Sequence, residues 1–355
     1  MSEHALAANP APLRVERWNP LSAVFTGALV LTLGVLAFAP ELFGQGTLDN
    51  LIQLYFLVML AIMWNALAGY GGLVSVGQQA FIGIGAYAVV YLSVQHSLNP
   101  YFAMLLAALI GGAISIPIAA IVLWLRGGAF AIGMWVVAEV VAILVSLDAS
   151  LGGGTGTSAV LAFNLRYTPE QRLRNTYWFA LAAAASLLVV LFVLLRSRLG
   201  ASLQAIRDDE EAAASVGVRV LLGKGVLFVL AGTGCAAAGA VIVAWQLSIL
   251  PLGPDSIFGI NWSAYMIFMV LVGGLGTFEG PIIGAVVLYL LDTYLSSPMG
   301  IWYLVMLGGV AIGVALFLPK GIWGTVQDRF GLRLLPVGYR LRARSQAGQA
   351  KGDSL

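Results

Sequence analysis

Three polar residues stand inside an apolar, glycine-rich stretch of the sequence and could contact a small polar molecule within a membrane. Ser75, Gln78 and Gln79 lie between Gly69 and Leu92, a segment otherwise apolar enough to enter a lipid bilayer. An amide that faces lipid is costly, so these side chains are expected to face protein or water. Two interpretations remain open. Either the glutamines hydrogen-bond adjacent helices and fix the bundle, or they line the route of a small zwitterionic substrate along a discontinuous helix.

Glycines add two further candidate positions to this route. Gly83 and Gly85 permit neighbouring backbones to approach closely, and they permit a helix to break where freed carbonyls line a cavity. A second glycine-rich stretch, LGGGTGTS at 151–158, is expected at the outer mouth. Thr155 and the backbone donors there could meet a carboxylate, with a flexible loop as the alternative.

Glu139 is a candidate because it stands in the middle of the apolar segment 128–148. An ionised carboxylate at that depth costs about 2.5 to 3.5 kcal/mol. The apolar segments offer no Lys, Arg or His as a counter-ion, so Glu139 is either protonated or faces a wet cavity. A pathway or gating role and a hydrogen-bonded structural role are both open. Asp292, near the outer end of its segment, is expected to be wetted there.

Several other chemistries find no support in the residues available. His4 and His96 lie outside the apolar segments, and no Cys/His cluster has metal-ligand spacing. Cys235 stands alone in an apolar run, where packing is its expected role. The stretch 217–225 lacks the Ser or Thr that follows GK in a phosphate-binding loop. We therefore expect no catalytic residue, metal or nucleotide on this chain, and the net charge of +2 does not indicate nucleic-acid binding.

The elements that must position these residues are membrane-spanning helices. Hydrophobic residues make up 60% of the chain and charged residues only 10%, which is far from the composition of soluble domains. Every backbone amide in lipid needs an internal partner, so the spans are expected to be helical. The fold class is therefore an all-α polytopic membrane protein. Hydropathy predicts about ten spans, within a range of about eight to eleven, at 21–40, 48–68, 72–94, 100–125, 128–148, 176–195, 225–247, 257–275, 281–296 and 301–318.

The distribution of basic residues predicts the orientation of these spans. Of the 18 Lys and Arg residues, 15 fall on the side of both termini, and only Arg166, Arg172 and Arg174 fall on the other. Basic residues favour the cytoplasmic side, so both termini are expected in the cytoplasm. The chain then divides into a cytoplasmic N-terminal tail (1–20), a transmembrane domain (21–320) with one long cytoplasmic loop (196–224), and a basic cytoplasmic C-terminal tail (321–355), which is expected to touch membrane lipid.

The long cytoplasmic loop is expected to form one amphipathic helix from 201 to 216, with Gly217 at its end. Leu203, Ile206 and Ala213 can share an apolar face, while the acids at 208–211 are exposed. Four consecutive acids argue against an anionic lipid surface. A groove on another protein is therefore the better interpretation.

A resemblance becomes specific in this loop, because Glu211, Ala212, Ala213 and Gly217 match the EAA-x-x-x-G signature of membrane subunits of bacterial ABC importers. Together with GYGGLVSVGQQAFIGIGAY and VGGLGTFEGPIIGAVV (272–287), the loop makes the chain similar to the LivM/LivH family of branched-chain amino acid permeases. The resemblance runs from about residue 45 to 320. One departure is that residues 227–230 lack the proline of the full signature.

The resemblance implies a non-enzymatic transport subunit of the bacterial inner membrane that imports branched-chain amino acids. Its implied partners are a second related permease, two cytoplasmic ATPase subunits that hold ATP and Mg²⁺, and a periplasmic substrate-binding protein. Arg207 and Asp208, with the four signature residues, would contact the ATPases. Two alternatives stay open: the same importer class for urea, short amides or aromatic acids, and a secondary transporter driven by an ion gradient with Glu139 as proton carrier.

Overall fold

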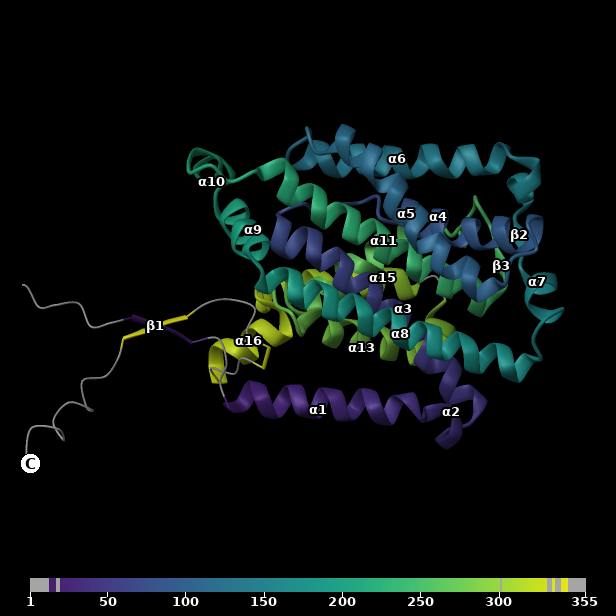
Figure 1. The fold of residues 1–355 in the computed structure, drawn as a ribbon, viewed down its shortest axis with the longest axis horizontal. Coiled ribbons are helices and arrows are strands. Elements are labelled where there is room, and N and C mark those ends of the chain that lie inside the picture. The colour runs from purple at the N-terminus through teal and green to yellow at the C-terminus, as the bar shows by residue number, and fades with distance from the viewer. Residues whose placement is uncertain (1–12, 17–19, 301, 331–333, 336–339, 344–355) are drawn as a thin grey trace, which may run out of the picture.

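The protein is described here by a computed structural model that covers residues 13–16, 20–300, 302–330, 334–335 and 340–343 (Figure 1). These residues are almost all helical. Seven helices are long and apolar enough to cross a membrane, and three shorter apolar helices accompany them. Each predicted span corresponds to one of these helical segments, so the predicted all-α polytopic fold is confirmed.

Two helices form the centre of the bundle, namely α3 (Gln45–Asn65) and α11 (Val220–Gln246). Both are apolar on nearly all sides, and most of their residues are buried, as expected for helices surrounded by other helices. Five helices pack around them: α4 (Gln79–Val90), α5 (Pro100–Val122), α8 (Pro169–Arg196), α12 (Ile260–Gly273) and α13 (Gly280–Leu291).

Three helices at the periphery expose most of their apolar side chains: α1 (Pro20–Ala37), α6 (Gly128–Leu147) and α15 (Trp302–Phe317). Helix α1 lies along one side of the bundle (Figure 1). At its C-terminal end, the Tyr177 hydroxyl donates to the Leu36 carbonyl oxygen at 2.7 Å. Lipid is the expected neighbour of such exposed apolar surface.

The two ends of the bundle carry different elements (Figure 1). The end on the left of Figure 1 is called the near end below. It carries α9 (Arg198–Asp208), α10 (Glu210–Ser215), α16 (Gly321–Phe330) and the antiparallel pair β1 (Leu13–Glu16) and β4 (Arg340–Ala343). The opposite, far end carries α2 (Ala39–Leu42), α7 (Val160–Asn164) and the antiparallel pair β2 (Thr157–Ser158) and β3 (Ser248–Ile249). The near end thus brings together the two terminal strands and the long loop, as the predicted orientation requires.

Short helical turns make up further parts of the described residues. Three π-helical turns extend α3, α4 and α13, at Ala66–Tyr70, Tyr91–Gln95 and Asp292–Ser296. Two 3₁₀ turns and a short helix lie in the connections at the far end: Ala149–Leu151, Gly153–Thr155 and α14 (Ser297–Met299).

The predicted span 72–94 is wrong as a continuous helix. Residues 72–78 are not helical, and α4 begins only at Gln79. Glycine at 71, 72 and 77 weakens helix formation, and Gly72 has a φ of +66°. The 12 residues of α4 and the five of the π-helical turn that follows form one helical segment, Gln79–Gln95, which is about 25 Å long and shorter than a bilayer of about 30 Å. The helix therefore starts inside the bundle.

The first part of the predicted C-terminal tail packs on the bundle. Helix α16 packs on α12 and α13, with Gly321 and Gly324 buried. Leu335 is buried as well. Apart from the strand β4, the remainder of the predicted tail lies outside the described residues.

Candidate functional site

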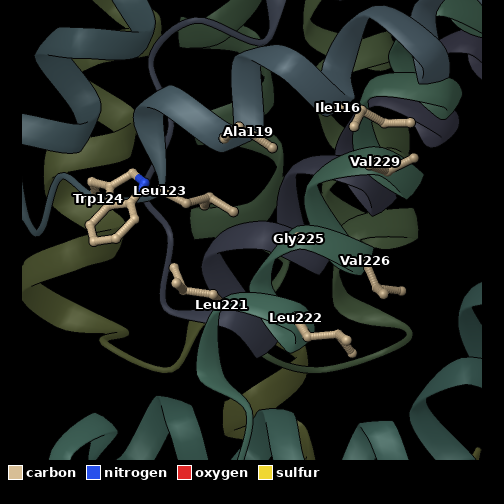
Figure 2. A pocket seen from close by; sticks show the side chains of 10 residues that line it. Ile116, Ala119, Leu123, Trp124, Leu221, Leu222, Gly225, Val226 and Val229 are labelled. Carbon is tan, nitrogen blue, oxygen red and sulfur yellow. The ribbon is translucent and has the colours of Figure 1, made fainter.

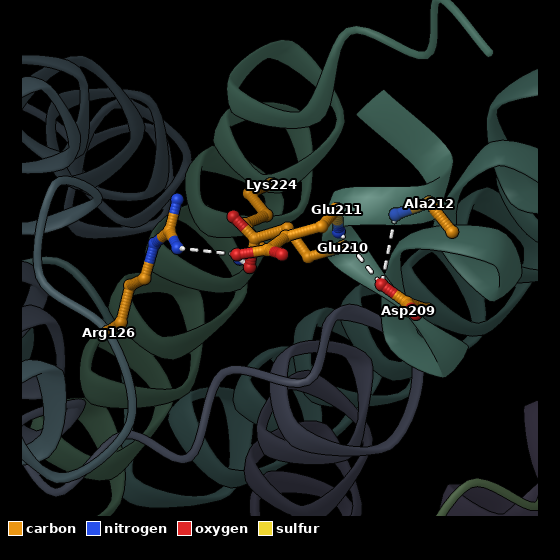
Figure 3. Close-up of polar contacts among 6 residues, drawn as sticks. All are labelled: Arg126, Asp209, Glu210, Glu211, Ala212 and Lys224. Carbon is orange, nitrogen blue, oxygen red and sulfur yellow. Dashed lines mark hydrogen bonds and ion pairs between the residues drawn. The ribbon is translucent and has the colours of Figure 1, made fainter. Parts of the chain in front are cut away.

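The long near-end loop folds as two short helices instead of the single predicted helix. The break falls at Asp209, whose backbone is extended with a φ of −158°. Its carboxylate oxygen accepts hydrogen bonds from the backbone amides of Glu211 at 3.0 Å and Ala212 at 2.9 Å (Figure 3). An aspartate that caps a new helix in this way competes with continuation of the previous one. The prediction of a single helix from 201 to 216 did not take this competing cap at Asp209 into account.

The apolar face predicted for this loop is confirmed. Leu203, Ile206 and Ala213 are 1%, 3% and 3% exposed, respectively. Asp208 and Ala212 are exposed on the other side. The loop therefore presents polar side chains outward while its apolar face packs against the bundle.

Gly217 ends α10, as predicted. Its φ is +88°, its amide donates to the Ala214 carbonyl, and the amide of Val218 donates to the Ala213 carbonyl. This is the left-handed helix end for which glycine is preferred. A Cβ at this position would meet no atom within 4 Å, so the requirement for glycine is a matter of backbone conformation alone.

Two ion pairs hold α10 to the bundle (Figure 3). Lys224 Nζ lies 2.6 Å from Glu210 Oε2, and the lysine side chain is only 10% exposed. Arg126 Nη1 lies 3.8 Å from Glu211 Oε1, with both side chains exposed. Neither basic partner is predictable from the local sequence, because Arg126 lies in the connection between α5 and α6, Lys224 lies on α11, and both contacts with α10 depend on the tertiary fold.

The Glu210 pair is expected to contribute more to stability than its neighbour. Glu210→Gln leaves the nearly buried Lys224 ammonium without its partner, so we expect a loss of about 1–3 kcal/mol. Glu211→Gln removes an exposed, long ion pair and should change the melting temperature little. Thermal unfolding of both variants in detergent measures the difference. Equal melting temperatures would contradict this account, and a Glu210→Lys/Lys224→Glu double variant should recover part of the loss.

A glycine-rich turn between α12 and α13 lies directly against α9. A Cβ added at Gly276 would lie 2.5 Å from Nη1 and 3.1 Å from Cζ of Arg207, so the guanidinium rests on the bare backbone of this turn. Gly276 also has a φ of +76°. The positive φ is the condition that favours glycine, since the flexible end of the Arg207 side chain could move away from an added Cβ. Arg207, which was predicted to be a coupling residue, thus contacts the turn at Gly276, a segment far away in sequence.

The same turn is fixed to the central helix α3 by one side chain. Asn65 Nδ2 donates to the Thr277 carbonyl at 2.8 Å, and the Gly276 amide donates to Asn65 Oδ1 at 2.9 Å. Asn65 is 1% exposed. Because both groups of the amide bind the backbone of the turn, α9, the turn and α3 form one continuous set of contacts.

Glu279 connects this turn to the C-terminal segment. Its carboxylate accepts from the Leu335 amide at 2.7 Å and from Trp323 Nε1 at 3.1 Å. Burial raises the pKa of Glu279, and these hydrogen bonds act in the opposite direction. No local pattern in the sequence indicates these contacts, because the partners of Glu279 lie 44 and 56 residues away.

The polar residues of the interrupted helix are all fully buried. Trp64 Nε1 donates to the Ser75 carbonyl at 2.8 Å, and Gln78 Nε2 donates to Ser75 Oγ at 3.2 Å. Gln79 bonds the Val76 carbonyl and accepts a bond from Ser263 on α12. These contacts fix the break and join α4 to α12. A pathway role for Ser75, Gln78 and Gln79 stays a prediction, although Gln78 Oε1 is buried without a partner among the described residues.

Gly83 and Gly85 lie at close helix contacts. A Cβ at Gly85 would collide with the Ala236 carbonyl of α11, and one at Gly83 would collide with the Phe258 ring. On the opposing helix, a Cβ at Gly239 would collide with the Ile82 carbonyl. Reciprocal glycines of this kind let two helices pack backbone to backbone. Packing therefore accounts for both residues, and a pathway role for them is untested.

Glu139 faces away from the bundle. It is exposed midway along α6, where Trp135 Nε1 donates to its carboxylate at 3.1 Å. Thr155 is exposed at the far end and bonds only the Gly152 carbonyl, at 2.8 Å, among the contacts described. A pathway role for Glu139 and Thr155 stays a prediction.

One cavity of the bundle does not suit a polar substrate. It measures about 550 Å³ and lies between α5 and α11 towards the near end (Figure 2). Its walls are almost entirely hydrocarbon, with Leu123, Leu221 and Val226 among the side chains that point into it. Such a groove fits an apolar chain and offers no partner to an ammonium or carboxylate group.

An all-α bundle with seven helices able to span a bilayer defines a multi-pass membrane protein. The model of the family described as branched-chain amino acid transport system, permease component, matches residues 46–315. The chain belongs to this family, and the resemblance seen in the sequence is confirmed. Members of this family are permease subunits of transport systems and are not themselves enzymes.

Two curated relatives cover most of the chain. They are the high-affinity branched-chain amino acid transport system permease proteins LivM of Salmonella typhimurium (strain LT2) and Escherichia coli (strain K12). Each is 27% identical over 357 residues, which cover 94% of this chain and 80% of the relative. No solved structure was found to match the chain significantly.

Proposed function

We propose that this chain is the permease subunit of an ABC importer that moves branched-chain amino acids delivered by a periplasmic binding protein across the bacterial inner membrane. The observation that carries the proposal is the α9–α10 pair: an exposed, acid-rich surface at the near end, anchored to the bundle by the Glu210–Lys224 ion pair. Separate ATPase subunits hold ATP and Mg²⁺ and drive transport. Permease components of branched-chain amino acid transport systems match the chain over nearly its whole length.

The coupling residues form the first part of the mechanism. Arg207, Asp208, Glu211, Ala212 and Gly217 belong to the surface that an ATPase groove would receive, whereas Ala213, predicted as a coupling residue, is buried and holds α10 against the bundle. A displacement of α9 moves the Arg207 guanidinium against the Gly276 backbone, and Asn65 passes that displacement to the central helix α3. Rigid short helices ended by an aspartate cap and a glycine are suited to such transmission.

The second permease is the partner assigned to the exposed face of α6. Less than a quarter of that helix is buried within this chain. An ionised Glu139 facing lipid would cost about 2.5 to 3.5 kcal/mol, whereas a protein neighbour or a water-filled path between two permeases removes that cost. The translocation path would then run between the subunits, with Glu139 at its wall.

Deletion of the ATPase subunits tests the transport class. In cells that carry this chain, the second permease and the binding protein, leucine uptake should fall to background when the ATPases are removed. Uptake that survives and follows the proton gradient would instead establish a secondary transporter. Competition of leucine uptake by urea, acetamide and phenylalanine addresses the alternative substrates, and strong competition by one of these would reassign the cargo.

A further inference from the structure

A second cavity, at the far end of the bundle, has a composition quite unlike the apolar groove between α5 and α11. It measures about 200 Å³ and is enclosed by α3, α11, α12, α13 and α15. This volume is below the range of about 300–1,000 Å³ that drug-sized ligands occupy. The cavity therefore suits one small molecule or one headgroup.

Aromatic rings form much of the wall of this cavity. The centroid of Phe56 lies 5.7 Å from that of Trp245 and 6.2 Å from that of Trp262. Trp262 in turn meets Tyr265 edge to face, at 6.2 Å. Tryptophan faces attract cations more strongly than other aromatic rings do. Rings from α3, α11 and α12 thus converge on one small space.

A carboxylate completes the wall. Asp292 is half-buried, and one of its oxygens accepts a hydrogen bond from Gln53 Nε2 at 3.1 Å. The Tyr303 hydroxyl is buried, in a residue only 4% exposed, and it lies close enough to Asp292 to interact with that carboxylate. Asp292 was expected from the sequence to be merely wetted, whereas the structure places it in the wall of a defined site.

The charge of the residues that line this cavity is negative. None of the residues that line the cavity is Lys, Arg or His, and Asp292 is the one carboxylate among them. Asp255, on the loop that precedes α12, also acts electrostatically on Tyr265. An anion would therefore be repelled, and a cation would find a carboxylate and aromatic faces together.

We propose that this cavity binds a primary ammonium group. Two sources share that chemistry: the amino end of a small zwitterion entering the channel, and the ethanolamine headgroup of a lipid. The proposal goes beyond the transport assignment, because it concerns binding by this chain without its partners.

Three compounds with one branched skeleton test the proposal. The full chain is placed in phosphatidylglycerol nanodiscs and titrated calorimetrically with 3-methylbutylamine, leucine and 4-methyl-2-oxopentanoate. The amine and leucine should bind, and the keto acid should not. Equal binding of all three, or no binding of the amine, would overturn the site. Neither result would bear on the transport proposal, since no ATPase is present.

Variants locate the binding. Asp292→Asn should weaken amine binding at least about tenfold, while Asp49→Asn, a carboxylate on α3 outside the cavity lining, should leave it unchanged. Trp262→Leu keeps the Asp292–Gln53 contact and should weaken binding severalfold, so the site is tested even where Asp292→Asn does not fold. Unchanged affinity in the folded variants contradicts the proposal. Nanodiscs of phosphatidylethanolamine then distinguish the two sources, because a lipid headgroup in the cavity would compete with the amine.

Discussion

Asn65→Leu is expected to abolish coupled amino-acid uptake while the ATPases continue to hydrolyse ATP. The leucine side chain is similar in size, but it leaves the Thr277 carbonyl and the Gly276 amide without their partners. Each buried group left unpaired costs about 1–3 kcal/mol. The glycine-rich turn then separates from α3, and displacement of α9 no longer reaches the central helix. The ratio of leucine transported to ATP hydrolysed in proteoliposomes measures the effect.

Asn99→Leu is the matched control for this prediction. Asn99 also makes two hydrogen bonds, to the Tyr101 amide at 3.0 Å and to the Tyr167 hydroxyl at 2.7 Å, but it is exposed and lies at the far end. Its loss should cost about 1 kcal/mol of stability as a lost helix cap, with coupling intact. If both variants transport with the same ratio as the unaltered chain, the proposed connection between α9 and α3 is wrong.

Gly85→Val is expected to prevent the bundle from forming. Its side chain would press on the Ala236 carbonyl, which is backbone and cannot turn aside, so α4 and α11 would have to separate. Overpacking against backbone is expected to cost about 3 kcal/mol or more. Size-exclusion chromatography and thermal unfolding in detergent should show little or no folded protein.

Gly308→Val provides the comparison, because Gly308 lies within α15 and a Cβ there would meet nothing within 4 Å. This variant should fold normally. A well-folded Gly85→Val protein with altered uptake would contradict the packing role and favour the pathway role predicted from the sequence.

Hydropathy predicted the ten apolar segments because the cost of an unpaired amide in lipid acts on each segment separately. The amphipathic face of the coupling loop and its end at Gly217 were also predictable, because both depend only on residues that are close in sequence. The break at Asp209 was a competition between two local preferences, and the cap prevailed over helix continuation.

The contacts that build the site were beyond this kind of prediction. Asn65 and Gly276 are 211 residues apart, and nothing in either local pattern indicates that one binds the other. Glu279 likewise finds its donors only through the packing of α16 and the residues after it. Glu139 was identified from its depth in an apolar segment, but its outward direction depends on how α6 rotates against the bundle.

The most direct test of the central claim is ATP hydrolysis by the reconstituted complex of this chain, a second permease, the ATPases and the binding protein. Leucine-loaded binding protein should stimulate hydrolysis, and a Glu211→Lys/Gly217→Pro chain that still inserts should lose the stimulation. The assignment of α9–α10 as the coupling surface would be contradicted if the rate of ATP hydrolysis did not change on addition of loaded binding protein. It would also be contradicted if the chain with the altered α10 were stimulated as strongly as the unaltered chain.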